Sequence, residues 1–240
     1  RKSCVRNFLG IVIEETRVSN QSILCQSAYA CAGSKRSKRL VESYMTIYTA
    51  IVDGHSDTCK TAAVNFVDTF HDMRMSPAAV KTIKKAVNEL KKNDLYDIRL
   101  CPETMGKINQ LGTLSEVIEL CKIAPVYHPV VDFGHMNARN VGGYFTDVDS
   151  YRAVFDKIGN ALGDEYVHNL HCHFSKIEWT QSGEKKHLTF DDEVFGPAFE
   201  PLAEAIVREG VCPRIICESA GTMAEDALFM KNQWLGAKGE

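Results

Sequence analysis

Acidic and histidine residues recur at four points in the second half of the chain, each at the end of a short apolar run. The four points are Cys101-Pro102-Glu103, Asp132-Phe133-Gly134-His135, His171-Cys172-His173 and Cys217-Glu218. Carboxylates together with imidazoles favour zinc, manganese or iron over calcium, which takes oxygen ligands alone. Buried carboxylates are costly without partners, and a shared divalent cation removes that cost. These residues therefore predict a metal site.

The spacing of the candidates suggests more than one ion. Asp132 and His135 are three positions apart, so one turn directs both toward neighbouring ions. His171 and His173 have the same parity on an extended strand and point to the same side. His187 follows a Gly-Glu-Lys-Lys stretch that can reach over the site. The carboxylate count suits a centre with two or more ions, which is suited to in-line phosphoryl transfer.

Structural roles compete with ligation at several positions. Glu103 and Glu218 are also placed to cap helix N-termini, and Asp132 suits a turn. His171 has the alternative of a hydrogen-bonded core residue, and His173 is open between ligation, orientation of a ligand and packing. The cysteines beside the candidates, at 101, 172 and 217, are expected to fill the core rather than to bind as thiolates.

Alternating strands and helices must position these side chains. A helix begins at Ser76-Pro77, an N-cap followed by a first-turn proline. Further helices are expected over 114–123 (capped by Thr113 or Ser115), 148–162 and 199–209, and strands over 96–101, 129–133, 166–172 and 213–218, with a polar connection after 172. Nearly continuous apolar strands between helices predict a parallel sheet covered by helices. Active sites form where the carboxyl ends of such strands meet.

Residues 1–74 carry weaker signals, with candidate strands at 11–13 and 47–52 and helical character over 36–49. No stretch approaches the roughly 18 apolar residues of a membrane span, so no membrane partner is expected. Glu14 and Glu15 follow the short apolar run at the start, which makes a poor secretory signal. Nine scattered cysteines without CxxC pairs suit a reducing, cytoplasmic location.

The net charge of −3 hides an asymmetry between +3 over 1–74 and −6 over 75–240. The balance does not supply the basic surface that duplex-binding proteins usually present. Basic patches can coexist with an acidic average, and bound cations offset carboxylates locally. The charge therefore does not decide the partner.

An ordered set of motifs resembles the endonuclease IV family, with a closer likeness to the endonuclease IV-like proteins of archaea and anaerobic bacteria. The motifs are CPETMGKINQLGTLSEVIELC, DFGHMNAR, HCHFSK, GEKKH and CESAG, within about residues 76–235. The resemblance implies an eight-stranded TIM-type (β/α) barrel that cleaves DNA at abasic sites with three zinc ions. We expect one barrel domain over 1–240, with a poorly matched part at 1–74 and a well-matched part at 75–240.

The resemblance also implies roles for single residues. The ligands around the bridged metal pair correspond to Glu103, Asp132, His171 and Glu218, and those of the third metal to His135 and His187. Glu218 and Glu103 are the expected catalytic carboxylates. Glu218 is expected to orient the nucleophile or to accept its proton.

The chain departs from the family at the third metal. The family has an aspartate two residues before the last histidine, and this chain has Lys185 there. The candidate substitutes are Glu184 and His173; otherwise the third site is weak or empty.

A second departure concerns the first half of the chain. The family takes two histidines from its third and fourth strands, and only His55 is a candidate for one of them, while Glu14 or Glu15 stands in place of the other. About six strands can be counted where a complete barrel has eight. We therefore expect a barrel that is incomplete at its N-terminal part.

Three functions follow from these observations. The first is a deoxyribonuclease IV-like endonuclease, a DNA-repair hydrolase that acts as a monomer on DNA containing abasic sites and cleaves 5′ to the lesion with two or three Zn²⁺, or with Mn²⁺. The second is a metal-dependent sugar isomerase or epimerase of the same barrel superfamily, which Lys185 and the acidic average favour. The third is a barrel that binds metal or nucleic acid without turnover, which the missing histidine and strands favour.

Overall fold

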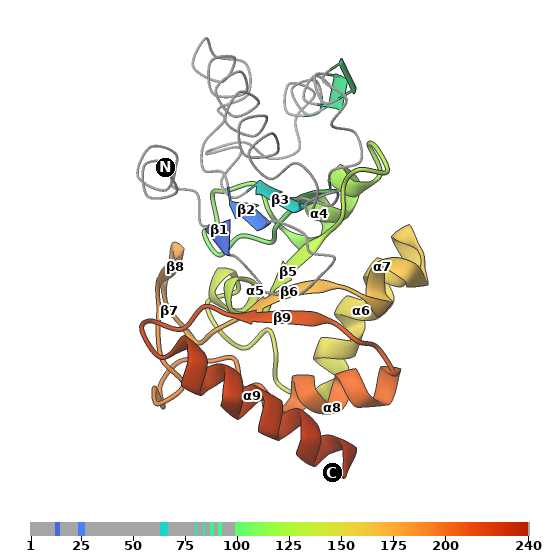
Figure 1. The fold of residues 1–240 in the computed structure, drawn as a ribbon. Coiled ribbons are helices and arrows are strands. Elements are labelled where there is room, and N and C mark those ends of the chain that lie inside the picture. Colours follow the sequence, from blue (N-terminus) through green and yellow to red (C-terminus); the bar gives the residue numbers. More distant parts are fainter. Residues whose placement is uncertain are drawn as a thin grey trace. The chain divides into compact units, whose positions relative to one another are not determined.

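The computed structural model describes residues 99–239 throughout (Figure 1). Before them it describes Ile13–Glu14, Leu24–Gln26, Ala63–Phe66 and the helical positions 80, 84, 87, 88, 91 and 92. His55 and the candidate segments at 36–49 and 47–52 lie outside the described residues. The chain divides into two compact units, one of Arg1–Glu103 with Asn109–His128 and one of Thr104–Ile108 with Pro129–Glu240. The single barrel domain expected over 1–240 stays a prediction.

A four-stranded sheet characterises the first unit. Its order is β1 (Ile13–Glu14), β2 (Leu24–Gln26), β3 (Ala63–Phe66) and β4 (Arg99–Pro102). The pair β1–β2 is antiparallel, and the other two pairs are parallel. Helix α4 (Leu114–Cys121) begins at the predicted cap, where Thr113 Oγ1 accepts from Glu116 N at 3.3 Å and Thr113 N donates to Glu116 Oε2 at 2.9 Å.

A parallel three-stranded sheet forms the centre of the second unit. Its order is β5 (Val130–Asp132), β6 (His171–Phe174) and β9 (Arg214–Cys217). The register places Asp132 opposite His173, and His173 opposite Ile216. Helices α6 (Val148–Leu162), α8 (Glu200–Glu209) and α9 (Met223–Lys238) follow one another in contact, α6 with α8 and α8 with α9 (Figure 1). The predicted α/β class is confirmed, and a closed barrel stays a prediction.

Helix α6 has the predicted bounds because its signals are local. Asp147 accepts from Ser150 N at 2.8 Å and thereby caps the first turn. The buried stripe of the helix packs on Phe133, whose ring centroid lies 5.4 Å from that of Tyr151 and 6.4 Å from that of Phe155. None of the described helices is long and apolar enough to cross a membrane.

The strand predicted over 166–172 is wrong in its bounds. Residues Asp164–His168 form the short helix α7, and β6 begins only at His171. Tyr166 and Val167 favour strands by composition, and a helix of about one turn shows no periodicity that would reveal it. As a consequence, His171 begins the strand and His173 lies near its carboxyl end.

The polar connection predicted after residue 172 is in part a β-hairpin. It consists of β7 (Ile177–Thr180) and β8 (Gly183–His187), which pair antiparallel. In addition, helix α5 (Phe133–Arg139) begins directly after β5 and carries His135. Both elements lie in the second unit, together with most of the candidate ligands.

Candidate metal centre

Three side chains at the carboxyl end of the parallel sheet form a first ligand group of Asp132, His173 and Glu218. Each offers one ligand atom, and these atoms lie within 4.8 Å of one another. Asp132 is the last residue of β5 and is 0% exposed, and His173 is 2% exposed. Glu218 follows β9, where its N–H donates to Phe174 O at 3.1 Å, and its Oε1 lies 3.2 Å from His173 Nδ1. Parallel pairing therefore brings these three donors together at the carboxyl ends of their strands.

His171 contacts this group without belonging to either group of possible ligands found among the described residues. Its Nε2 lies 3.0 Å from Nε2 of His173, and the two rings are inclined at 70°. The structure thus brings together His173 rather than His171 with Asp132 and Glu218. Direct ligation by His171 stays a prediction.

Glu103 is the last residue of the Arg1–Glu103 segment of the first unit, and the next residue, Thr104, belongs to the second unit. Its side chain is buried, with 2% exposed, directly after β4. Its ligand and catalytic roles stay sequence predictions.

A second ligand group consists of His135, Glu184 and His187, whose ligand atoms also lie within 4.8 Å of one another. Nε2 of His135 lies 3.5 Å from Glu184 Oε2, and Nε2 of His187 lies 3.9 Å from Glu184 Oε1. The other ring nitrogens face Thr104 O at 3.0 Å and Ser175 Oγ at 2.8 Å. A carbonyl beside Nδ1 of His135 fixes the proton there, and Nε2 keeps a lone pair directed at the group, as in metal-binding histidines.

A β-bulge explains how Glu184 reaches this group. Glu178 pairs with Lys186 and Trp179 pairs with Glu184, so the register passes over Lys185. Residues three apart on a regular strand lie on opposite faces, and one extra residue reverses that relation. Glu184 and His187 accordingly are both half-buried, whereas Lys185 is exposed. Of the two substitutes considered for the missing aspartate, Glu184 is the one that joins the group.

Asp132 connects the two groups. Its Oδ1 accepts from His135 N at 2.7 Å and caps α5, and its Oδ2 lies 3.3 Å from His135 Nδ1. Within the described part of the chain, this buried Oδ2 accepts no hydrogen bond. A carboxylate oxygen in that position is expensive unless a cation faces it, so the donor set fits a divalent metal.

Cys172 belongs to neither ligand group found among the described residues. Burial raises the pKa of its thiol well above the usual range, and the charge of Asp132 raises it further. Cys172 fills the core with 0% of its surface exposed. The sequence predicts the same role for it.

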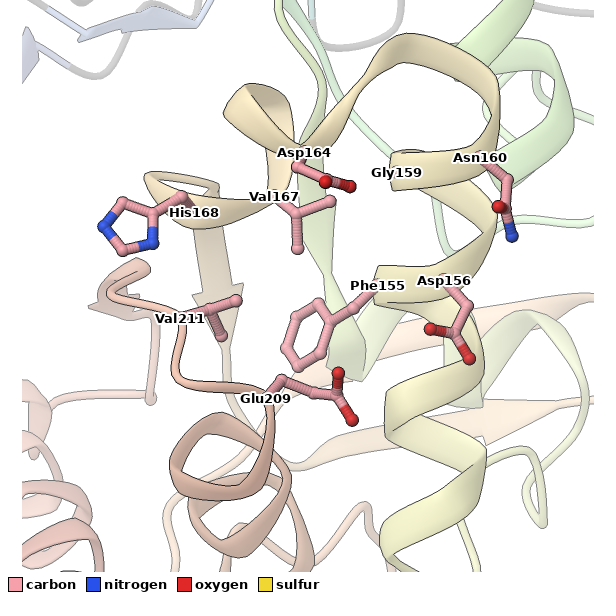
Figure 2. A pocket seen from close by; sticks show the side chains of 9 residues that line it. All are labelled: Phe155, Asp156, Gly159, Asn160, Asp164, Val167, His168, Glu209 and Val211. Atoms are coloured by element: carbon pink, nitrogen blue, oxygen red, sulfur yellow. The ribbon is translucent and has the colours of Figure 1, made fainter.

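A pocket of about 360 Å³ lies away from both groups (Figure 2). Its walls come from α6, α7, the end of α8 and the segment after it, and include Asp156, His168 and Glu209. These helices end where β6 and β9 begin, so the pocket is at the amino end of the sheet, whereas the ligand groups follow the carboxyl ends. Active sites of parallel α/β folds form at the carboxyl ends, which directs attention to the two groups.

The comparisons with known proteins are informative about the fold. No family model matches the chain. The uncharacterized protein MJ0133 of Methanocaldococcus jannaschii is 31% identical over 149 residues, or 62% of this chain. The match covers 53% of MJ0133, so the chain spans about half the length of this curated relative.

Two solved structures are similar to the chain. A xylose isomerase domain protein from Planctomyces limnophilus has a TM-score of 0.56 at 14% identity, covering 85% of this chain and 67% of that one. The IolI protein with a binding zinc atom has a TM-score of 0.52 at 10% identity, covering 89% and 74%. At 14% and 10% identity these likenesses bear on the fold alone: they support the α/β fold described above and assign no function to the chain.

Proposed function

We propose that the chain is a metal-dependent phosphodiesterase that cleaves DNA 5′ to abasic sites. The observation that carries the proposal is the presence of two ligand groups in one unit, Asp132/His173/Glu218 and His135/Glu184/His187. Asp132 and His135 join them at 3.3 Å. Neighbouring metal sites suit in-line phosphoryl transfer because one stabilises the attacking oxygen and the other the leaving oxygen.

Divalent ions bound here would polarise the phosphoryl group and lower the pKa of a bound water. Glu218 is the candidate base, because its side chain is 24% exposed while Asp132 and the His173 side chain are almost fully buried. It is therefore the member of the first group that incoming water reaches most easily. Under this proposal, His135 and His187, which are held through Nδ1, would bind through Nε2 the ion that stabilises the leaving 3′ oxygen.

The alternative is a metal-dependent sugar isomerase or epimerase. The likeness to a xylose isomerase domain protein supports it, as does a first group that offers two carboxylates and an imidazole to a single ion. Lys185 and Lys186 both pair with Glu178, so these cations are engaged within the hairpin rather than left to contact phosphates. A third possibility is a barrel that binds metal without turnover.

Metal content and DNA cleavage separate these functions. We expect two or three zinc ions per chain and cleavage of a duplex containing a tetrahydrofuran abasic analogue, with loss of cleavage in chelator. Glu218→Gln is expected to lower the rate roughly 100-fold or more, while Glu178→Gln, a matched change on β7, leaves it unchanged. One ion per chain and an intact duplex contradict the nuclease and support the isomerase. Metal or DNA binding without turnover of either substrate supports the non-catalytic barrel.

A further inference from the structure

Arg139 ends α5, the helix that carries His135, and holds a short segment of backbone. Its Nη1 donates to Met105 O at 3.2 Å and to Lys107 O at 2.5 Å, and its Nη2 donates to Ile108 O at 2.9 Å. The planar guanidinium has fixed donor directions, unlike an ammonium group, and so constrains the path of the carbonyls it binds. We call residues 104–108, which belong to the second unit, the clamped segment.

The clamped segment contacts both sides of the second ligand group. Thr104 O faces Nδ1 of His135 at 3.0 Å, and Gly106 O accepts from Glu184 N at 3.0 Å. Ile108 N donates to Ser182 O at 3.2 Å, which ties the segment to the turn of the hairpin. The backbone of Glu184 is therefore positioned by a segment that Arg139 holds.

The contact between the segment and the hairpin depends on close backbone approach. A Cβ at Gly106 would lie 2.5 Å from Glu184 Cβ, and a Cβ at Gly183 would lie 2.2 Å from Gly106 O. Gly183 also has φ +88°, which favours glycine. Because Gly106 and Gly183 lack side chains, their backbones come close together. The geometry of this contact is therefore set by backbone hydrogen bonds and by the hydrogen bonds of Arg139.

We infer that Arg139 is a positioning residue for the second ligand group and acts chiefly on Glu184. This inference rests on the proposed metal centre. Thr104 is anchored independently, since its N donates to Val130 O at 3.1 Å and its Oγ1 accepts from Asp132 N at 2.9 Å. Loss of the hydrogen bonds from Arg139 therefore loosens residues 105–108 and Glu184 more than it loosens His135. The first group is held by β5, β6 and β9 and keeps its geometry.

The test compares wild-type protein with Arg139→Lys, which keeps the positive charge and loses the planar guanidinium with its fixed donor directions. Arg152→Lys is the matched control, because Arg152 binds the carboxylates of Asp149 and Glu209 on another face of the unit. The readouts are zinc stoichiometry, zinc affinity by chelator competition, and amide exchange of Glu184 and Ile108 in the metal-free protein.

We expect Arg139→Lys to bind zinc at the second ligand group roughly 10- to 100-fold less tightly than wild type. Exchange of the Glu184 amide is expected to be at least about tenfold faster. Zinc at the first group is the internal control for folding and stays bound, and Arg152→Lys matches wild type. Wild-type protein that binds no zinc at the second group overturns the proposed centre. If wild-type protein binds zinc at the second group, two results overturn the inference alone. One is an Arg139→Lys variant that matches wild type in zinc affinity and in amide exchange; the other is a variant whose zinc affinity falls by the same factor at both groups.

Discussion

Nε2 of His171 lies 3.0 Å from Nε2 of His173, whose Nδ1 lies 3.2 Å from Glu218 Oε1. Two ring nitrogens at that separation share one proton, so one ring donates and the other accepts. If a metal occupies Nδ1 of His173, its Nε2–H is left to donate to His171. Under the proposed function, His171 then orients the ligand instead of binding the metal itself.

This relationship predicts different effects at the two histidines. His173→Ala is expected to abolish zinc binding at the first group, because a ligand is removed. His171→Gln is expected to weaken binding by roughly 10- to 100-fold, the usual effect of changing a residue that orients a ligand. Zinc affinities from chelator competition check both. Abolished binding in His171→Gln with retained binding in His173→Ala contradicts the assignment.

The bulge at Lys185 predicts that the second group depends on Glu184. Glu184→Gln is expected to weaken the corresponding zinc ion by at least about tenfold, since a charged ligand becomes neutral. Glu178→Gln is the matched control on the paired strand and is expected to keep both ions. Equal zinc stoichiometry and affinity in the two variants would show that Glu184 is not a ligand.

The charges on the hairpin predict a pH dependence. The hydrogen bond from Lys185, followed by that from Lys186, lowers the pKa of Glu178. The pKa of Glu178 in the folded state is thus below its value in the unfolded chain, which is about 4.3. The stabilisation from these hydrogen bonds is therefore fully present above the unfolded-chain pKa and is lost as the pH falls through the folded-state pKa. A carbon-13 NMR titration of the Glu178 carboxyl group measures its pKa in the folded protein.

Lys185→Met is expected to raise the pKa of Glu178 toward its ordinary value. Lys231→Met, an exposed change on α9, is the control and leaves that pKa where it is. An unchanged titration in Lys185→Met excludes the pair as the cause.

Packing around Phe133 predicts a large loss of stability. Its ring contacts those of Phe145, Tyr151, Phe155 and Phe174, and its exposed fraction is 0%. Phe133→Ala is expected to lower the free energy of unfolding by about 3–5 kcal/mol. Leu228→Ala, at a side chain that is 57% exposed, is expected to change it by less than about 0.5 kcal/mol. Urea unfolding measures both.

Elements with local signals were predictable from the sequence. Helix α6 has a capping aspartate and an apolar stripe, and α4 has the Thr113–Glu116 capping box. The strand β9 is a short apolar run after a proline. These signals are contained within one element, so no knowledge of the neighbouring elements is needed to interpret them.

Elements without such signals were missed or misplaced. Helix α7 begins at Asp164 after Gly163, an N-cap residue without a side chain, and α9 spreads its apolar residues around the helix instead of collecting them on one face. The strand β8, Gly-Glu-Lys-Lys-His, is polar and gains its structure from pairing with β7. Contacts with other elements stabilise each of them, α6 for α7, α8 and β9 for α9, and β7 for β8, and single-sequence patterns do not contain such contacts.

The candidate site shows the same division. Asp132 and Glu218 could be selected as candidates because Asp132 ends one apolar strand and Glu218 follows another. The distinction between His171 and His173 was not, because it depends on where β6 begins. The choice of Glu184 over Lys185 likewise depends on the register of the hairpin.

The extra residue in β8 also bears on how related sequences are recognised. A search pattern that demands an acidic residue two positions before the final histidine rejects this chain. Glu184, three positions before His187, reaches the same side because the strand accommodates one more residue. Under the proposed function, the acidic ligand can therefore stand either two or three positions before the final histidine, and patterns for such sites should allow both spacings.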